Sequence, residues 1–341
     1  MFSYVNFPGW IRPEVVSFLP VRWYAVMYIV AFSVAFVVFR KYCRQGALGE
    51  AFGGKNTDVS TDLFLYAITG LILGARIGSC LLYEGSAFYL THPWLIFWPF
   101  RNGTFTGLPG MSYHGGVTGA FLGVVLYARK SGYRVLDLCD GICVSVPLGY
   151  TFGRLGNFIN GELWGRCTGT AYGMIFPSAP SFSTNEEWVR LAAENAGIAY
   201  SNGSFVNLPR HPSQLYEAFF EGIFLFLVMW YVARPLVRKK KLGRGFLMGS
   251  YLAGYGLVRF FIEYFREPDS QLGFVIALGR ETEPTALFLS FFNISMGQVL
   301  CFIMIVIGTV LVYRGCRLEP TDYSAKSARS KGGSKKGGKK K

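Results

Sequence analysis

The stretch LDLCDGICVSVPLGYTFGRLGNFINGELWGR (136–166) joins an apolar run to a segment in which arginines, asparagines and a glutamate lie among glycines. The first part, 136–152, has the character of a membrane-spanning helix, which needs roughly 17–25 residues, although Asp137, Asp140 and Pro147 weaken it. Charged and amide groups directly after such a helix emerge at one surface of the membrane. The stretch therefore predicts a membrane span that ends in a polar site.

Composition extends this interpretation to the whole chain. Of its 341 residues, 51% are hydrophobic and 16% are charged, whereas a soluble domain carries about 25% charged residues. A soluble helical fold would need polar faces at a spacing of 3.6 residues, and the apolar windows lack them. We predict an all-α polytopic membrane protein with about seven transmembrane helices, placed at 21–39, 62–82, 112–128, 136–152, 216–233, 246–263 and 296–313.

The lysines and arginines predict the orientation of these spans. Most of the 34 fall in one alternating set of loops and in the carboxyl-terminal segment. The positive-inside rule then puts the amino terminus outside and the carboxyl terminus in the cytoplasm. The segment 153–215 is expected to form a small extracytoplasmic cap, and 272–293 to lie along the membrane interface on the same side.

The last residues differ from the rest in composition. We predict a membrane domain over 1–316 and a disordered basic cytoplasmic tail over 317–341, which ends in KGGSKKGGKKK. Such a tail suits an anionic lipid surface, at about 1 kcal/mol for each lysine near it. A nucleic-acid partner is not expected, because no aromatic residue is interleaved to stack on bases.

Three charged residues stand out in GYGLVRFFIEYFREPD (254–269). Arg259, Glu263 and Arg266 are spaced four and then three residues apart, so a helix would place them on one face. An arginine inside a span costs at least about 2.5–3.5 kcal/mol and usually faces a partner or a polar cavity. Either Arg259 and Glu263 pair to hold the bundle together, or Arg259 and Arg266 line a pocket for an anion, which the guanidinium fork grips well.

Arg76 in GARIGS (74–79) lies near the middle of the second span, where a structural and a functional role are equally open. Glycines at 70, 74 and 78 give that helix the small-residue spacing of close helix contacts.

Two histidines begin spans. His114, before two glycines, is either a proton acceptor or a structural histidine. His211, followed by Pro212, is interpreted mainly as part of a helix entry.

Arg154, Asn157 and Glu162 leave the fourth span on the same side of the membrane as His114 and the outer end of the sixth span. Arginines can bind a phosphate, amides can hydrogen-bond hydroxyl groups, and a carboxylate can accept hydrogen bonds that orient those hydroxyl groups. The sequence thus predicts a polar, cationic pocket for an anionic headgroup at the outer leaflet.

The stretch GRLGNFINGELWGR (153–166) resembles the signature of the bacterial prolipoprotein diacylglyceryl transferases. The resemblance covers about 4–315 and includes RWYAVMY (22–28), GARIG (74–78), MSYHGG (111–116), RHPSQLYE (210–217), GYGLVRFFIEYFREPD (254–269) and SMGQ (295–298). It implies transfer of the diacylglyceryl group of phosphatidylglycerol to the lipobox cysteine in the signal peptide of a preprolipoprotein. This is the first step of lipoprotein maturation, in the bacterial cytoplasmic (inner) membrane, with no metal or organic cofactor.

The resemblance also implies roles for particular residues. Arg154 matches the phosphatidylglycerol-binding arginine of the family and Arg259 a second essential arginine, while His114 and Tyr255 match residues proposed for proton handling. The remaining matches are pocket residues: Tyr24, Asn157, Glu162, Glu263 and Arg266. The basic tail and a longer loop at 270–295 depart from the family pattern without touching these positions.

Two other classes remain as alternatives. A transporter or flippase for an anionic solute would also place arginines inside the bundle, but the chain has no internal repeat and its polar groups gather at one face. A membrane acyltransferase with a histidine and an aspartate five residues apart is disfavoured, because Gly119 stands five residues after His114.

Overall fold

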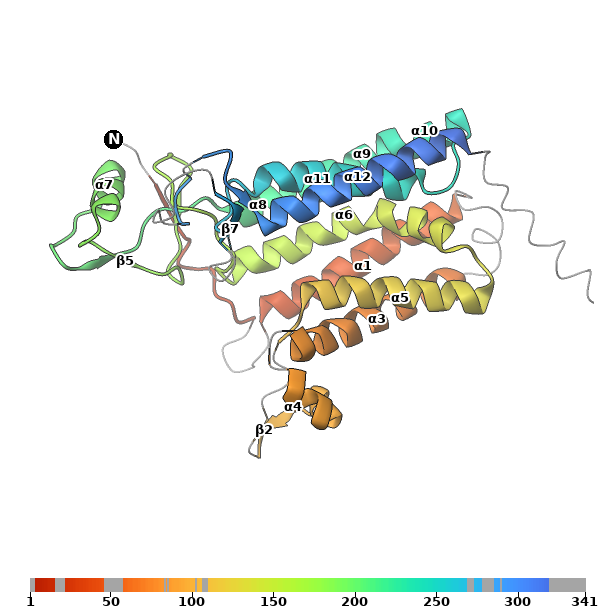
Figure 1. Cartoon of the computed structure of the whole chain (residues 1–341), viewed down its shortest axis with the longest axis horizontal. Helices are drawn as coiled ribbons and strands as arrows, with labels where there is room; N and C mark the ends of the chain where they lie inside the picture. The colour runs from red at the N-terminus through yellow and green to blue at the C-terminus, as the bar shows by residue number, and fades with distance from the viewer. Residues whose placement is uncertain are drawn as a thin grey trace, which may run out of the picture. The chain divides into compact units, whose positions relative to one another are not determined.

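A computed structural model describes residues 4–15, 22–45, 58–82, 84, 86–101, 103–105, 110–268, 273–277, 285–288 and 290–318. The fold is mostly helical (Figure 1). A helix lies at each of the seven segments predicted to span the membrane: α1 (Trp23–Arg44), α3 (Asp58–Leu82), α5 (Tyr113–Ser131), α6 (Val135–Ile159), the run Ser213–Lys240, α11 (Phe246–Ile262) and α12 (Met296–Arg317).

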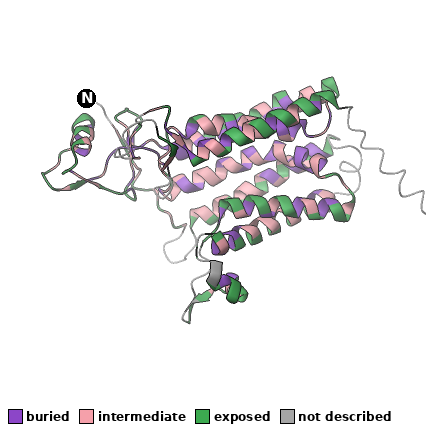
Figure 2. Ribbon diagram, in the orientation of Figure 1, coloured by how far each residue is buried: buried purple, intermediate pink, exposed green. Residues whose placement is uncertain are grey.

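Among the described residues, five of these helices are long and apolar enough to cross a membrane, namely α1, α3, α6, the run Ser213–Lys240 and α12, while α11 is a shorter apolar helix. The exposed side chains of α12 are apolar over most of its length, as Phe302, Val306 and Val310 illustrate (Figure 2). An exposed surface of this kind suits hydrocarbon better than water. The chain has the helices of a polytopic membrane protein.

The chain divides into two compact units, each described by itself: Met1–Val37 with Cys143–Pro320, and Val38–Ile142 with Thr321–Lys341. In the second unit, α3 and α5 run antiparallel with their backbones in contact. A Cβ on Gly74 would lie 2.3 Å from the carbonyl oxygen of Gly115, and one on Gly70 would lie 2.2 Å from that of Gly119. The predicted close contact through small residues is confirmed.

In the first unit, the run Ser213–Lys240 is a continuous helix of mixed type. It consists of α8 (Ser213–Glu217), η2 (Ala218–Phe224), α9 (Leu225–Val228), η3 (Met229–Ala233) and α10 (Arg234–Lys240), of which η2 and η3 are π-helical. Gly222 in η2 leaves room for Thr151 of α6, whose hydroxyl donates to the carbonyl of Ala218 at 3.3 Å. π-Helical turns of this kind often accompany functional sites.

The segment 160–212, between α6 and α8, has little regular structure. It contains α7 (Glu187–Ala196) and three strands, in which β4 (Met174–Ile175) pairs with β1 (Val5–Asn6) and β5 (Phe182–Ser183) pairs with β6 (Phe205–Val206). Its apolar core is made of Cys167, Val189, Ala193, Val206 and Leu208, with Ala286 from the segment before α12 packed among them. The predicted cap boundary at 153 was too early, because α6 remains helical to Ile159.

Two further pairs of short strands complete the described chain. β7 (Phe274–Ile276) pairs with β8 (Ile294–Ser295) in the first unit. The second unit holds α4 (Ser86–Thr91), η1 (Pro93–Ile96), β2 (Phe100–Arg101) and β3 (Thr104–Phe105). Residues 319–341 of the predicted tail lie outside the described residues, as does much of the loop predicted to lie along the interface.

Candidate functional site

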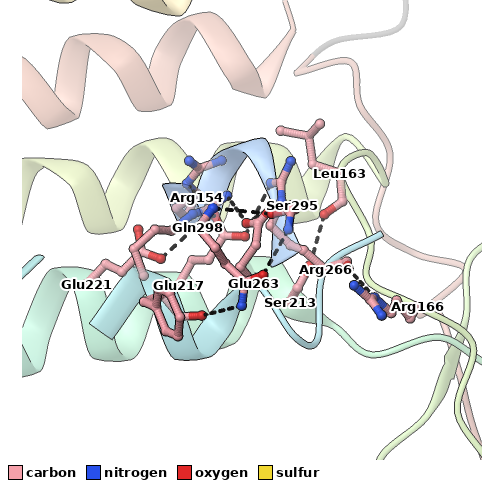
Figure 3. Close-up of polar contacts among 12 residues, drawn as sticks. Arg154, Leu163, Arg166, Ser213, Glu217, Glu221, Glu263, Arg266, Ser295 and Gln298 are labelled. Atoms are coloured by element: carbon pink, nitrogen blue, oxygen red, sulfur yellow. Dashed lines mark hydrogen bonds and ion pairs between the residues drawn. The ribbon is translucent and has the colours of Figure 1, made fainter. Parts of the chain in front are cut away.

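Charged side chains from three helices of the first unit meet around Glu217, the last residue of α8 (Figure 3). One of its carboxylate oxygens lies 2.8 Å from Arg154 Nε and 3.1 Å from Arg259 Nη1. The other lies 3.3 Å from Arg266 Nη1. A carboxylate this deeply buried is stable only when cations surround it, and Glu217 has three.

Two more glutamates complete the group. Arg259 Nη1 lies 3.3 Å from Glu221 Oε1, and Arg259 Nη2 lies 3.0 Å from Glu263 Oε2. The hydroxyl of Ser295, which caps α12, donates to Glu263 at 3.1 Å. We call Arg154, Arg259, Arg266, Glu217, Glu221 and Glu263 the arginine–glutamate cluster. With three charges of each sign, the cluster is neutral as a whole.

On the α6 side, a chain of hydrogen bonds leads away from the cluster. Arg154 donates to the Tyr150 hydroxyl at 2.6 Å and to Asn157 Oδ1 at 3.4 Å. Asn157 in turn donates to Glu162 Oε1 at 2.9 Å. The ring of Tyr255 packs edge-on against that of Tyr150, with 5.9 Å between centroids. These contacts connect four polar or aromatic side chains to Arg154.

Tyr24 on α1 reaches the same end of α6. A Cβ on Gly156 would lie 3.6 Å from its ring, and its hydroxyl lies 2.9 Å from that of Tyr28. The predicted site residues of the first unit are thus brought together, since Tyr24 packs beside the helix that carries Arg154 and Asn157.

The backbone that carries Arg266 to the cluster differs from the predicted helix. α11 ends at Ile262, so Arg266 lies beyond the helix, and the expected single helical face is wrong for this residue. The backbone of Arg266 pairs with that of Gly165, and Pro268 disfavours helical backbone at the residue before it. A turn brings the guanidinium back to Glu217.

His114 belongs to the second unit, and the cluster belongs to the first. It lies in the first turn of α5, whose N-cap Ser112 accepts a hydrogen bond from the Gly115 backbone at 3.1 Å. Its ring packs edge-on against Tyr113, with centroids 5.7 Å apart. A part for His114 in the same site stays a prediction.

Arg76 has the contacts of a structural residue. It is 2% exposed, its Nε donates to the carbonyl of Ile96 at 2.6 Å, and its Nη1 lies 3.1 Å from Glu84 Oε1. Of the two roles left open by the sequence, these contacts favour the structural one.

His211 lies at a helix entry, as interpreted from the sequence. Pro212 is the N-cap of α8, and the His211 ring packs against Phe265 and Tyr216. Burial, with a smaller contribution from the nearby Arg166, lowers the pKa of His211 from 6.5 to about 4. The imidazole is therefore neutral at neutral pH.

Sequence reasoning missed Glu217 and Glu221 as site residues. They stand four residues apart in YEAFFE (216–221), within an apolar span, and so share a helix face. The same argument that singled out Arg259 and Glu263 could have found them. Within the described residues, no group of three or more histidine, cysteine, aspartate or glutamate side chains could hold a metal ion.

Comparisons with known proteins place the chain in a family. The sequence model of the family described as prolipoprotein diacylglyceryl transferase matches residues 13–314. A phosphatidylglycerol–prolipoprotein diacylglyceryl transferase from Treponema denticola is 50% identical over 319 residues, which cover 90% of this chain and 93% of the relative. Proteins of the same name from Treponema pallidum and Chlorobaculum tepidum are 46% and 41% identical, over 89% and 93% of this chain and 93% and 94% of their own lengths.

Proposed function

The chain belongs to the prolipoprotein diacylglyceryl transferase family, and we propose that it transfers the diacylglyceryl group of phosphatidylglycerol to a preprolipoprotein. The acceptor is the thiol of the lipobox cysteine in the signal peptide. The thiolate attacks the lipid's glycerol carbon that carries the phosphate, a thioether bond forms, and glycerol phosphate leaves. The thiol proton goes to a base of the protein, so atoms and charge balance. This reaction is the first step of lipoprotein maturation.

The arginine–glutamate cluster is the proposed phosphate site. Charge builds up on the phosphate oxygens as the carbon–oxygen bond breaks, and fixed cations at that point lower the barrier. Arg154 and Arg259 would hold and neutralise the phosphate, with Arg266 beside them. Their side chains are 14–15% exposed, which leaves a path for a ligand.

The chemistry of the arginines' partners supports this role. Within the part of the chain that the structure describes, Arg154 contacts its partners through Nε and Nη1, and Arg266 contacts Glu217 through Nη1, while its Nε lies 3.8 Å from Glu263 Oε2. The Nη2 atom of each can donate to a phosphate oxygen. Because the cluster is neutral, an incoming phosphodiester competes with the three carboxylates, and its binding requires that one of them turn away or share its arginine.

Asn157, Glu162 and Tyr24 would recognise the rest of the headgroup. Asn157 and Glu162 form a hydrogen-bonded pair directly beside Arg154. An amide and a carboxylate can bond the two free hydroxyls of the glycerol headgroup, which distinguish this lipid from one with an amine.

Two residues are candidates for the proton acceptor. His114 is the preferred acceptor of the thiol proton, since a base must form the thiolate and only the thiolate is a good nucleophile. Tyr255 is the alternative, because its ring lies against Tyr150, which is bonded to Arg154. His114→Gln and Tyr255→Phe separate them, because only loss of the base should be overcome by raising the pH.

We further propose seven spans in the cytoplasmic (inner) membrane of a bacterium, with the amino terminus outside. The distribution of lysine and arginine supports this orientation, which makes the segment 160–212 an extracytoplasmic cap and the segment after Arg317 a cytoplasmic tail on the anionic leaflet.

The reaction can be tested with purified protein in liposomes that contain phosphatidylglycerol and a lipobox peptide. Mass spectrometry should detect a diacylglyceryl adduct on the peptide cysteine with wild type and not with Arg154→Ala. Arg238→Ala, which removes an exposed arginine of α10, is the matched control and should stay active. A folded wild-type protein that modifies nothing, but moves labelled anions across the bilayer, would support the transporter alternative instead.

A further inference from the structure

A segment of the second unit is unusually rich in exposed aromatic residues. It lies between α3 and α5, contains α4, η1, β2 and β3, and includes the run FYLTHPWLIFWPF (88–100). We call its described residues, 84, 86–101 and 103–105, the aromatic arm. None of the proposed chemistry uses it.

The aromatic arm has two faces. Tyr89 and Ile96 are buried in a small apolar cluster with Cys80 of α3. What we call its exposed face consists of its solvent-exposed large apolar side chains, with Trp94 63% and Trp98 55% exposed: Phe88, Leu90, Trp94, Phe97, Trp98 and Phe100. Six large apolar side chains within 13 residues form a patch that water solvates poorly.

Arg76 fixes the arm to α3. Its Nε donates to the Ile96 carbonyl at 2.6 Å, and its Nη1 bonds Glu84 at 3.1 Å and the Gly110 carbonyl at 3.4 Å. Glu84 also accepts from the hydroxyls of Ser79 at 2.9 Å and Tyr89 at 2.8 Å. One guanidinium thus ties the start and the middle of the arm to the helix, so the exposed face is held in a defined position.

The arm lies beside the last turns of α3. Arg76 stands six residues before the helix end at Leu82, about 9 Å along the axis at 1.5 Å per residue, and it still reaches Ile96. Figure 1 shows α4 and β2 displaced to the side of the α3–α5 pair. α3 is apolar and long enough to cross a membrane, and if it does so its last turns, with the arm beside them, would lie at a membrane boundary.

We propose that the exposed face of the aromatic arm inserts into the lipid at this boundary, between headgroups and acyl chains. Tryptophan prefers this zone because its ring is apolar while its N–H still finds polar partners. The one acidic residue of the arm, Glu84, is paired with Arg76, and the sequence 85–105 contains no aspartate or glutamate and one arginine, Arg101, so the arm carries no unpaired carboxylate to repel an anionic headgroup. In this view Arg76 is a positioning residue that holds the arm at the depth of the interface.

The test places a fluorescent bimane label at Trp98→Cys in full-length protein reconstituted in liposomes. The exposed Cys316 is first replaced by serine, since the other six cysteines are buried or half-buried. Tyr172→Cys, at a residue 77% exposed in the first unit, is the comparison site. Each labelled protein is exposed to aqueous iodide and, separately, to lipids with a nitroxide near the headgroup.

Quenching of the label at 98 by nitroxide lipid, several-fold stronger than at 172, with weak quenching by iodide, supports the proposal. Strong quenching by iodide at both positions, without quenching by lipid, overturns it and leaves the patch in water. Lipid quenching that a lipobox peptide removes also overturns it, because the patch would then be a docking surface for the substrate.

Arg76→Lys in the same labelled background tests the clamp. Lysine keeps the charge but lacks the guanidinium fork that bonds Glu84 and Ile96 together. The label at 98 should then lose lipid quenching and gain iodide quenching. Unchanged quenching in a folded variant would show that Arg76 does not position the arm. If this variant does not fold, the label at 98 with Arg76 intact still tests whether the arm inserts into lipid.

Discussion

The arginines of the cluster are half-buried and Arg76 is buried, all beside glutamates, yet they differ in what else they bind. Arg76 donates to the backbone carbonyls of Ile96 and Gly110 as well as to Glu84. The partners that the structure gives Arg154 and Arg259 are side chains throughout: carboxylates, the Tyr150 hydroxyl and the Asn157 amide.

This difference separates structural arginines from those able to bind a ligand. A backbone carbonyl is fixed by the surrounding chain, whereas a carboxylate on rotatable bonds can turn aside for a phosphate. Two other arginines of the first unit belong to the Arg76 class. Arg166 donates to the carbonyl of Arg266 at 2.6 Å, and Arg210 donates to that of Gly165 at 3.2 Å. The comparison predicts opposite mutational signatures for the two classes.

Arg154→Ala should show the largest effect on activity. Removing one preorganised donor to developing charge lowers kcat by about 10²–10³, while Glu217 keeps Arg259 and Arg266 as partners. Initial rates of peptide modification and thermal unfolding in detergent are measured on the same samples. A variant that loses thermal stability while its rate per folded molecule is unchanged would place Arg154 among the structural arginines.

Arg76→Ala should show the reverse pattern. It removes the guanidinium that bonds Glu84 and the Ile96 carbonyl. We expect the free energy of unfolding to fall by about 3 kcal/mol. This is the low end of the range for breaking a buried ion pair, because Glu84 is partly exposed. The rate per folded molecule should stay near wild type. Loss of rate at unchanged stability would move Arg76 into the functional class.

Glu217→Gln and Glu221→Gln sharpen the account of the cluster. Glu217 contacts three arginines, whereas Glu221 contacts Arg259. We expect Glu217→Gln to lower the free energy of unfolding by about 2 kcal/mol and to reduce kcat, because three guanidinium groups lose a shared anchor. Glu221→Gln should have the weaker effect on both, and equal effects would argue against Glu217 as the centre.

His211 should make stability depend on pH. Its pKa is about 4 in the folded protein, whereas in the unfolded chain it is near 6.5. The unfolded state therefore binds the proton first, and stability is lost as pH falls from 6.5 towards 4. In thermal unfolding between pH 7.5 and 4.5, wild type should lose stability relative to His211→Gln. A difference that does not change with pH would contradict the lowered pKa.

Removal of residues 319–341 should have the smallest effect. The proposed tail contributes about 1 kcal/mol per lysine to attraction by an anionic surface, but it supplies no residue of the cluster. Peptide modification by the purified truncated protein should match wild type, and an inactive, folded truncation would show that the tail has another role.

Much of the helical framework could be predicted because hydrocarbon imposes long apolar runs. The ends of the helices could not. α6 continues to Ile159 through Arg154 and Asn157 because partners on the same and neighbouring helices satisfy both side chains. The π-helical η2 was equally hidden, since an extra residue in a turn leaves no signature in apolar periodicity.

The candidate site was predicted in part for a related reason. Arg259 was found because an arginine inside a span is costly in a membrane, and Arg154 because it directly follows the predicted fourth span. Their counter-ions Glu217 and Glu221 were missed although they stand four residues apart within an apolar span, because the sequence does not show that Glu217 meets arginines from other segments of the chain. Arg266 was predicted for the right place through the wrong geometry, since a turn and not a helix delivers it.

The most direct experiment measures the rate of Arg154→Lys in two series, one that varies phosphatidylglycerol at saturating lipobox peptide and one that varies the peptide at saturating phosphatidylglycerol. Lysine keeps one positive charge but cannot make the paired hydrogen bonds of the guanidinium. If the cluster holds the lipid phosphate, KM for phosphatidylglycerol rises or kcat falls, and KM for the peptide stays at its wild-type value. A changed KM for the peptide, with unchanged kcat and unchanged KM for the lipid, would contradict the account.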